Sequence, residues 1–172
     1  MEIRKDNEKL RYMVRAGMFA ALTALMTALL HIPVGNGYIH CGDAVIFLAA
    51  LSLPVPYAAG AAAVGGMLAD VLSGYAAYAL PTFLIKGLLA LAFSAVGGTR
   101  RLEKRRIFAM ILCGLISVIG YWITAVILYG GWSAQFFGTV PGNCVQAAAS
   151  GIVYTVIAAA LERMHDPRMR IL

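Results

Sequence analysis

The sequence predicts an all-α integral membrane protein, a bundle of six transmembrane helices with both termini in the cytoplasm. Of its 172 residues, 61% are hydrophobic and only 13% are charged, which leaves more apolar surface than a soluble domain can bury. Residues 107–161 contain no Asp, Glu, Lys or Arg, whereas one membrane span needs only about 20 apolar residues. We therefore expect a single membrane domain over residues 1–172.

The distribution of basic residues predicts the orientation of this bundle. Of the 14 Lys and Arg residues, all but Lys86 precede the first apolar segment, separate the fourth from the fifth, or follow the sixth. They are Arg4, Lys5, Lys9, Arg11 and Arg15; Arg100, Arg101, Lys104, Arg105 and Arg106; and Arg163, Arg168 and Arg170. With six spans these segments share one side, which the positive-inside rule makes cytoplasmic. The net charge of +6 does not indicate nucleic-acid binding, because the basic residues lie in loops between spans.

The first helix is expected at about residues 12–31, after a polar and basic start, residues 1–11, that is expected to begin as a surface helix. It carries an alanine at every fourth position, at Ala16, Ala20, Ala24 and Ala28. This spacing places the four methyl groups on one stripe of the helix. Small residues let another helix approach closely in lipid, so the stripe packs either on this protein's own helices or on a partner.

A polar island at residues 33–43 follows, and then two helices at about 42–53 and 57–73. The island combines turn-forming and polar residues between two apolar segments, which is typical of a chain that surfaces and re-enters the membrane. Pro54 and Pro56 separate the two helices. The second of them is rich in Gly and Ala, which predicts close packing inside the bundle.

The last three helices are expected at about residues 80–97, 107–129 and 140–161. Pro81 and Pro141 suit the first turn of a helix, where the missing N–H matters least. An aromatic and uncharged connection, residues 130–138, precedes the last helix.

The sequence carries no motif of a hydrolase, a metalloprotease or a nucleotide-binding loop. We therefore expect no enzyme activity and no cofactor, and the scattered His and Cys residues indicate no metal site. Three ionisable residues do lie within apolar segments, at Asp43, Asp70 and Lys86. Charge is costly at membrane depth, so each of them is a functional-site hypothesis.

Polar and aromatic residues gather at the predicted outer ends of the helices. Asn143 and Gln146 are three residues apart and share one face of the last helix. Aromatic walls with a few placed polar groups are typical of small-molecule sites. The predicted substrate-binding residues are Tyr38, His40, Asp43, Tyr75, Tyr78, Lys86, Trp132, Gln135, Asn143 and Gln146.

Structural roles remain open for the polar members of this set. Asp43 suits the N-terminal dipole of its helix as well as it suits a ligand. Lys86 has the alternatives of extending to the interface or pairing with Asp43 or Asp70. The two amides suit interhelical hydrogen bonds equally well. For Asp70, a structural role is the expectation.

Five segments together resemble the substrate-binding S components of energy-coupling factor (ECF) vitamin transporters. They are AGMFAALTA at 16–24, GDAVIFLAA at 42–50, ADVLSGY at 69–75, PTFLIKG at 81–87 and PGNCVQ at 141–146. The likeness covers nearly the whole chain and is greatest to the branch for hydroxymethylpyrimidine, pyridoxine or riboflavin. Neutral, flat rings of this kind suit Tyr, Trp and amide groups.

The resemblance implies six helices in a prokaryotic plasma membrane, with both termini in the cytoplasm and a vitamin site near the outer face. It further implies that Ala16, Ala20 and Ala24 dock on a transmembrane coupling subunit, and that two separate ATPase subunits supply the energy. The alternative is a self-sufficient small secondary transporter or channel that uses Asp43, Asp70 and Lys86 as a relay. No inverted repeat relates the two halves of the sequence, which disfavours that alternative.

Overall fold

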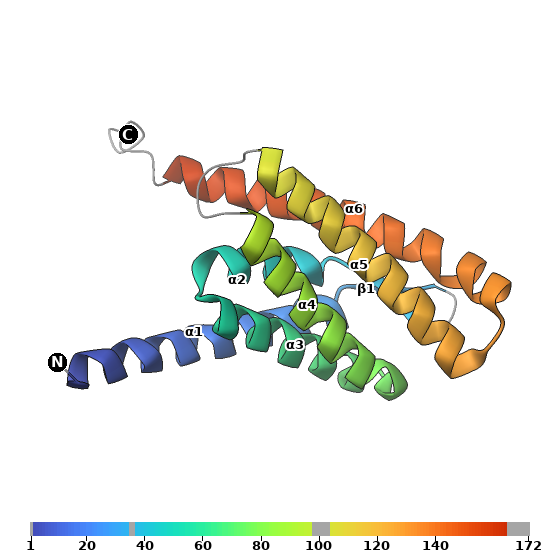
Figure 1. Ribbon diagram of the computed structural model, residues 1–172, viewed down its shortest axis with the longest axis horizontal. Helices are drawn as coiled ribbons and strands as arrows, with labels where there is room; N and C mark the ends of the chain where they lie inside the picture. Colours follow the sequence, from blue (N-terminus) through green and yellow to red (C-terminus); the bar gives the residue numbers. More distant parts are fainter. Residues whose placement is uncertain (1, 35–36, 98–103, 165–172) are drawn as a thin grey trace.

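A computed structural model describes residues 2–34, 37–97 and 104–164 and is nearly all helical (Figure 1). Its elements in chain order are α1 (Glu2–Ala28), β1 (His31–Val34), β2 (Gly37–His40), α2 (Gly42–Ser52), α3 (Val55–Leu72), η1 (Ala76–Tyr78), α4 (Ala79–Gly97), α5 (Lys104–Tyr129) and α6 (Trp132–Met164). Within these described residues α3, η1 with α4, α5 and α6 are long and apolar enough to cross a membrane, and α2 is a shorter apolar helix. The expectation of an all-helical membrane protein is confirmed to this extent, while the count of six spans stays a prediction.

Helix α1 is longer than expected at its start and shorter at its end. The polar residues before Tyr12 belong to the same helix, which runs for 27 residues from Glu2 to Ala28. This stretch contains no proline that would interrupt it. The helix ends before His31, whose ring nitrogen Nδ1 lies 2.7 Å from the carbonyl oxygen of Ala28.

The polar island is partly a β-hairpin, which the sequence analysis missed. Strands β1 and β2 pair antiparallel, with His31 opposite His40 and Pro33 opposite Tyr38. Pro33 is tolerated because a two-stranded sheet consists of edge strands, where a missing N–H is acceptable. The period-two pattern places Tyr38 and His40 on the same face of β2.

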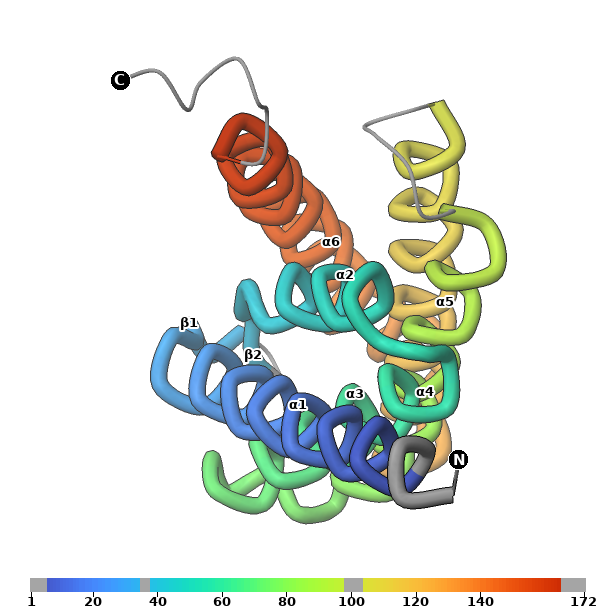
Figure 2. The backbone as a smooth tube through the Cα atoms, turned by 90° about the vertical axis from the view of Figure 1, so that its left-hand side faces the viewer, coloured from blue at the N-terminus to red at the C-terminus, as the bar shows by residue number. Residues whose placement is uncertain are grey.

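Helix α2 is the central element of the fold. Figure 2 shows it between α1 and α6, and it also packs against α3 and α4. Eight of its 11 residues are buried, on every side of the helix. Pro54 caps the start of α3 and Pro56 lies in its first turn, so the two prolines separate α2 from α3 as expected.

Three aromatic rings hold the middle of the bundle together. The rings of Phe47 on α2 and Phe93 on α4 stack with centroids 4.7 Å apart. Tyr154 on α6 meets both rings edge-on, at 5.6 and 5.4 Å. Such pairs contribute about 0.5–1.5 kcal/mol each beyond their buried area, so this cluster joins α2, α4 and α6.

The alanine stripe of α1 packs within the chain. Ala20 and Ala24 are buried, and a Cβ on Gly65 of α3 would stand only 2.6 Å from the backbone oxygen of Ala20. The absence of a side chain at Gly65 is thus what permits this approach. Ala16 is half-buried. Gly17 lies on the adjacent, exposed face of α1, and a Cβ added at Gly17 would point into open space.

Helix α6 corrects the expectation of a connection at residues 130–138. The turn is made by Gly130 and Gly131 alone, both with positive φ, and α6 begins at Trp132. Trp122 of α5 stabilises this early start, because its Nε1 donates to the backbone oxygen of Trp132 at 3.3 Å and its ring contacts Phe136 edge-on. Pro141 consequently lies inside α6 and not in its first turn.

Helix α5 begins at Lys104, so Arg106 is a helical residue and not part of a basic loop. Its Nη1 donates to Glu162 of α6 at 2.8 Å. Arg100, Arg101, Arg168 and Arg170 lie outside the described residues. In Figure 1 the start of α1, the end of α4, the start of α5 and the end of α6 point toward the same side of the molecule. This arrangement agrees with the sorting of basic residues, and the side of the membrane stays a prediction.

Candidate functional site

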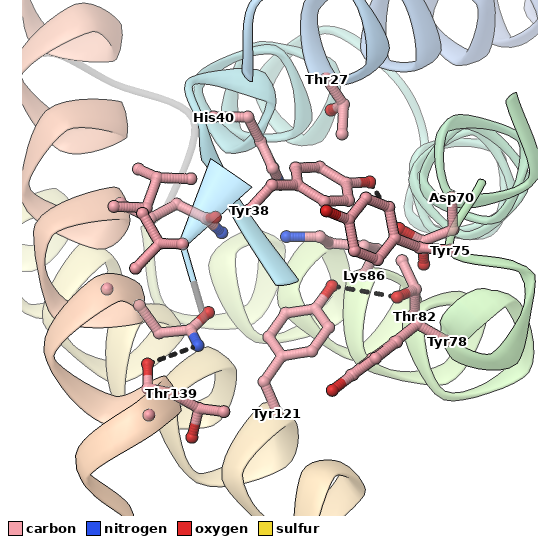
Figure 3. Close-up of a pocket in the computed structure, with 16 residues that line it drawn as sticks. Thr27, Tyr38, His40, Asp70, Tyr75, Tyr78, Thr82, Lys86, Tyr121 and Thr139 are labelled. Carbon is pink, nitrogen blue, oxygen red and sulfur yellow. Dashed lines mark hydrogen bonds between the residues drawn. The ribbon is translucent and has the colours of Figure 1, made fainter. Parts of the chain in front are cut away.

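A cavity opens at the other end of the bundle, where the hairpin meets α3, α4, α5 and α6 (Figure 3). Its volume is about 50 Å³, which holds only a few water molecules. The residues that line it are Thr27, Val34, Tyr38, Ile39, His40, Asp70, Tyr75, Tyr78, Thr82, Lys86, Tyr121, Gly138, Thr139, Gly142, Asn143 and Gln146.

Most of the predicted site residues meet in this cavity. Those that line it are Tyr38, His40, Tyr75, Tyr78, Lys86, Asn143 and Gln146. Asp43 is buried behind Lys86, while Gln135 is buried in α6 without lining the cavity. Trp132 is 63% exposed and contacts Trp122 on the outside of α5, so it lies apart from the cavity.

The sequence analysis missed several polar lining residues. Thr82 lies four residues before Lys86, and Thr139 lies four residues before Asn143. This spacing puts each pair on one helix face, which is the signal that would have found them. Tyr121 sits within an apolar helix and offered no such signal, and Asp70 was assigned a structural role.

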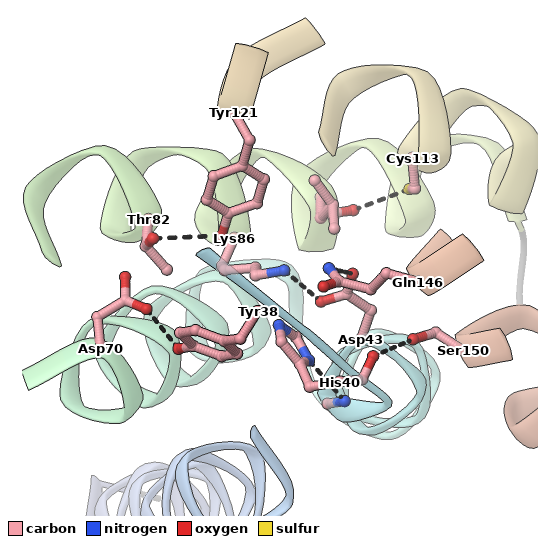
Figure 4. A network of polar contacts seen from close by, with 12 residues as sticks. Tyr38, His40, Asp43, Asp70, Thr82, Lys86, Cys113, Tyr121, Gln146 and Ser150 are labelled. Atoms are coloured by element: carbon pink, nitrogen blue, oxygen red, sulfur yellow. Dashed lines mark hydrogen bonds and ion pairs between the residues drawn. The ribbon is translucent and has the colours of Figure 1, made fainter. Parts of the chain in front are cut away.

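A buried ion pair forms the floor of the site (Figure 4). Lys86 Nζ of α4 donates to Asp43 Oδ1 of α2 at 2.5 Å, and the two side chains are only 1% and 3% exposed. Gln146 Nε2 of α6 donates to Asp43 Oδ2 at 3.2 Å. Lys86 therefore pairs with Asp43, one of the open alternatives, and Asp43 also lies in the first turn of α2, at the positive end of the helix dipole.

Asp70 forms a second polar group at the other side of the cavity. The hydroxyl of Tyr38 donates to Asp70 Oδ1 at 2.5 Å, which ties β2 to α3. Asp70 is 4% exposed, and its Oδ2 is buried without a hydrogen-bond partner among the described residues. Nearby, the hydroxyls of Thr82 and Tyr121 are 3.2 Å apart.

Aromatic rings form the walls. The Tyr38 ring lies 4.8 Å from that of Tyr75 and 5.6 Å from that of His40, centroid to centroid. Tyr78 and Tyr121 are 6.4 Å apart, and Lys86 Nζ lies 5.3 Å from the Tyr121 ring centre. These aromatic side chains pack on one another at distances typical of aromatic pairs.

The hairpin residues keep their neutral forms. Burial, and then the positive charge of Lys86, lower the pKa of His40 to about 3. Its Nδ1 accepts a hydrogen bond from the Gly42 N–H at 3.0 Å, as a neutral imidazole does. Burial and the Asp70 carboxylate raise the pKa of Tyr38, which therefore stays a phenol that donates.

The chemistry of the cavity is that of binding. Within the described ranges, 2–34, 37–97 and 104–164, no three His, Cys, Asp or Glu residues are placed to hold a metal ion. Stacking faces, hydroxyls, amides and one carboxylate oxygen suit recognition of a small organic ligand.

Comparisons with known proteins agree with this geometry. The family described as "ECF-type riboflavin transporter, S component" matches residues 7–163. An uncharacterized protein of Pyrococcus woesei is 33% identical over 138 residues, which cover 78% of this chain and 88% of the relative. A solved structure, described as the S component of a bacterial ECF transporter, superimposes with a TM-score of 0.75 at 19% identity and covers 92% of this chain and 99% of its own. With its fold and most of its length matched, the chain belongs to the S-component family of ECF transporters, in its riboflavin-type group, whose members are substrate-binding transport proteins and not enzymes.

Proposed function

We propose that this S component captures a flat heteroaromatic vitamin of the riboflavin class in the tyrosine-walled cavity. The observation that carries the proposal is the convergence on one cavity of Tyr38 from β2, Tyr75 and Tyr78 from the start and end of η1, and Tyr121 from α5. The family description supports the choice of riboflavin as the first ligand to test. In this proposal the cavity faces the outside of a prokaryotic plasma membrane.

Binding in this proposal requires the cavity to widen. Small-ligand sites measure roughly 300–1,000 Å³, whereas this cavity has about 50 Å³. We expect the hairpin to move away from the helices when the ligand enters, because three of its residues, Val34, Tyr38 and Ile39, line the cavity. We expect the Tyr38 and Tyr75 rings to separate from their 4.8 Å contact and to stack on the ligand.

The test is a titration of the detergent-solubilised protein with riboflavin, followed by flavin fluorescence, with hydroxymethylpyrimidine and pyridoxine compared by calorimetry. We expect saturable binding of riboflavin, and Tyr75→Ala to weaken it about tenfold, the equivalent of about 1.4 kcal/mol. Tyr12→Ala is the matched control, because Tyr12 is a half-buried tyrosine paired with Tyr57 and absent from the cavity lining. Failure of the wild-type protein to bind any of the three vitamins would refute the proposal.

We further propose that uptake is energised by a transmembrane coupling subunit with two ATPase subunits, which dock on α1. Because Ala20 is buried against α3, the exposed side of α1 is the part that a partner reaches without unpacking the bundle. Gly17→Trp on that side is expected to prevent copurification with the coupling subunit while the fold survives. Ala20→Trp is expected to disrupt the fold itself.

Vesicle transport separates this proposal from a self-sufficient transporter. The mutual neutralisation of Asp43 and Lys86 leaves neither of them ready to relay an ion. Uptake in vesicles that contain this chain alone, without ATP, would favour the alternative and overturn the need for a partner. A tag after Leu172 that reacts from outside intact cells would overturn the proposed orientation.

A further inference from the structure

We propose that Asp70 anchors the ligand in this cavity, accepting an N–H or O–H from an uncharged or cationic ligand and selecting against anionic ones. The inference rests on the proposed function and assigns a specificity-determining residue to the same site.

Only one of the two carboxyl oxygens of Asp70 accepts a hydrogen bond among the described residues. Its Oδ1 is occupied by the Tyr38 hydroxyl. Its Oδ2 lines the same buried region without a hydrogen bond within the described part of the chain, although the residue is only 4% exposed. A buried acceptor without a donor costs about 1–3 kcal/mol, so a ligand that supplies the donor recovers this free energy on binding.

The other polar groups around Asp70 do not fill this need. The Thr82 hydroxyl is near enough to interact with the Asp70 carboxyl group, but the positions of the atoms give Oδ2 no hydrogen bond. The same hydroxyl lies 3.2 Å from that of Tyr121, and either of the two can be the donor. Lys86 extends toward Asp43, to which its ammonium is bonded at 2.5 Å. Asp70 is thus the one carboxyl group that lines the cavity among the described residues.

The described residues around the cavity leave no unpaired cation. Lys86 and Asp43 cancel, His40 is neutral because its pKa is about 3, and the Asp70 carboxyl group is the remaining acidic side chain of the lining. A second anion brought into this low-dielectric end would meet a carboxylate and no unpaired cation. A ligand edge with ring N–H, amino or hydroxyl donors meets an acceptor instead, so the matching substrate class is a donor-bearing vitamin in its unphosphorylated form.

The deciding comparison is between riboflavin and flavin mononucleotide, which share a ring system and differ by a phosphate. We expect the wild-type protein to bind riboflavin more than about tenfold tighter than flavin mononucleotide. Asp70→Asn keeps the size of the side chain and removes the charge. It is expected to weaken riboflavin about tenfold and to reduce the preference over flavin mononucleotide to about threefold or less.

Glu162→Gln is the matched control, a carboxylate removed from the far end of α6, and it is expected to leave both affinities unchanged. Tyr38→Phe keeps the Asp70 charge and is expected to retain the preference for riboflavin. If Asp70→Asn fails to fold by circular dichroism, Asp70→Ser makes the same comparison.

The outcomes separate the two proposals. No binding of riboflavin, hydroxymethylpyrimidine or pyridoxine by the wild-type protein would refute the proposed function. Riboflavin binding with equal affinity for flavin mononucleotide, or with a preference that Asp70→Asn leaves intact, would refute the role of Asp70 while the proposed function stands.

Discussion

Two ion pairs tie helices together at opposite ends of this bundle, and they differ in how far water reaches them. At the cavity end, Lys86 of α4 bonds Asp43 of α2 at 2.5 Å with both side chains nearly inaccessible, 1% and 3% exposed. At the far end, Arg106 of α5 bonds Glu162 of α6 at 2.8 Å, and the Glu162 side chain is 39% exposed.

The difference predicts what each pair does for stability. Two charges buried together are neutral as a unit, but the loss of one leaves the other without solvent or counter-charge. A carboxylate that is more than one-third exposed is solvated when its partner is lost, and its contribution is screened. The cavity-end pair should therefore be sensitive to single substitutions, and the far-end pair should tolerate them.

The largest expected effect is that of Lys86→Met. This change leaves the Asp43 carboxylate buried with only Gln146 to bond it, and removal of one partner of a buried pair costs about 3–5 kcal/mol. Thermal unfolding of the detergent-solubilised protein, followed by circular dichroism, is the measurement.

The matched control is the double variant Asp43→Asn/Lys86→Met, which removes both charges. We expect it to recover most of the lost stability, because an uncharged, well-packed replacement of a buried pair is often neutral. A single variant that unfolds at the wild-type temperature would show that the pair is hydrated and that the comparison fails.

Gly66→Ala tests the same pair through its packing, with a smaller expected effect. A Cβ at Gly66 of α3 would stand 2.7 Å from Lys86 Cγ and 3.0 Å from Thr82 Cγ2. Since Asp43 holds Lys86 at its other end, the side chain has little room to yield, and overpacking of this kind costs about 1–3 kcal/mol.

Gly60→Ala, in the same helix, is the control for helix propensity. No atom lies within 4 Å of a Cβ at Gly60, so the substitution is expected to stabilise α3 by about 0.5–1 kcal/mol. Equal changes in unfolding temperature for the two alanine variants would contradict the close contact at Lys86.

Titration of His40 tests how far water reaches the cavity-end ion pair, because burial and the charge of Lys86 both lower the pKa of this imidazole. The pKa is about 3 in the folded protein and about 6.5 when unfolded, so between these values the unfolded chain binds the extra proton. The stability from neutral His40 is thus fully present above pH 6.5 and is lost as the pH falls toward 3. The expected loss is up to about 1.4 kcal/mol per pH unit.

His40→Asn, whose Oδ1 can accept the Gly42 N–H in place of the ring nitrogen, isolates this contribution. We expect its unfolding temperature to fall less steeply than that of the wild-type protein between pH 6.5 and 4. Parallel pH profiles for the two proteins would show that the imidazole reaches solvent.

The same pairs show where sequence reasoning succeeds and where it stops. Apolar segments and Pro54 locate α2 and α3 to within two residues, because these are local signals. Lys86 was left with several possible partners, since Asp43 is 43 residues away and only the packing of α2 between α1 and α4 brings them together. The role of Asp70 likewise depends on Tyr38, which the hairpin delivers from another segment.

The hairpin and the start of α6 were missed for a different reason. The hairpin is short and contains Pro33, a residue typical of turns. Only its pairing with Tyr38 shows that the segment is a strand. Residues 132–139 have no marked helical period, and their helix depends on contacts of Trp122 with Trp132 and Phe136. Tertiary contacts decide both segments.

The smallest expected effect completes the comparison at the far end. Glu162→Gln keeps an oxygen that accepts from Arg106 Nη1 and removes only the charge. Because the Glu162 side chain is 39% exposed, the change is expected to cost about 0.2–1 kcal/mol, the range of solvent-exposed pairs. It should shrink further as salt is raised, whereas the Lys86→Met defect should not. A salt-independent loss in Glu162→Gln as large as that of Lys86→Met would show that burial of Arg106, at 3% exposure, dominates this pair too.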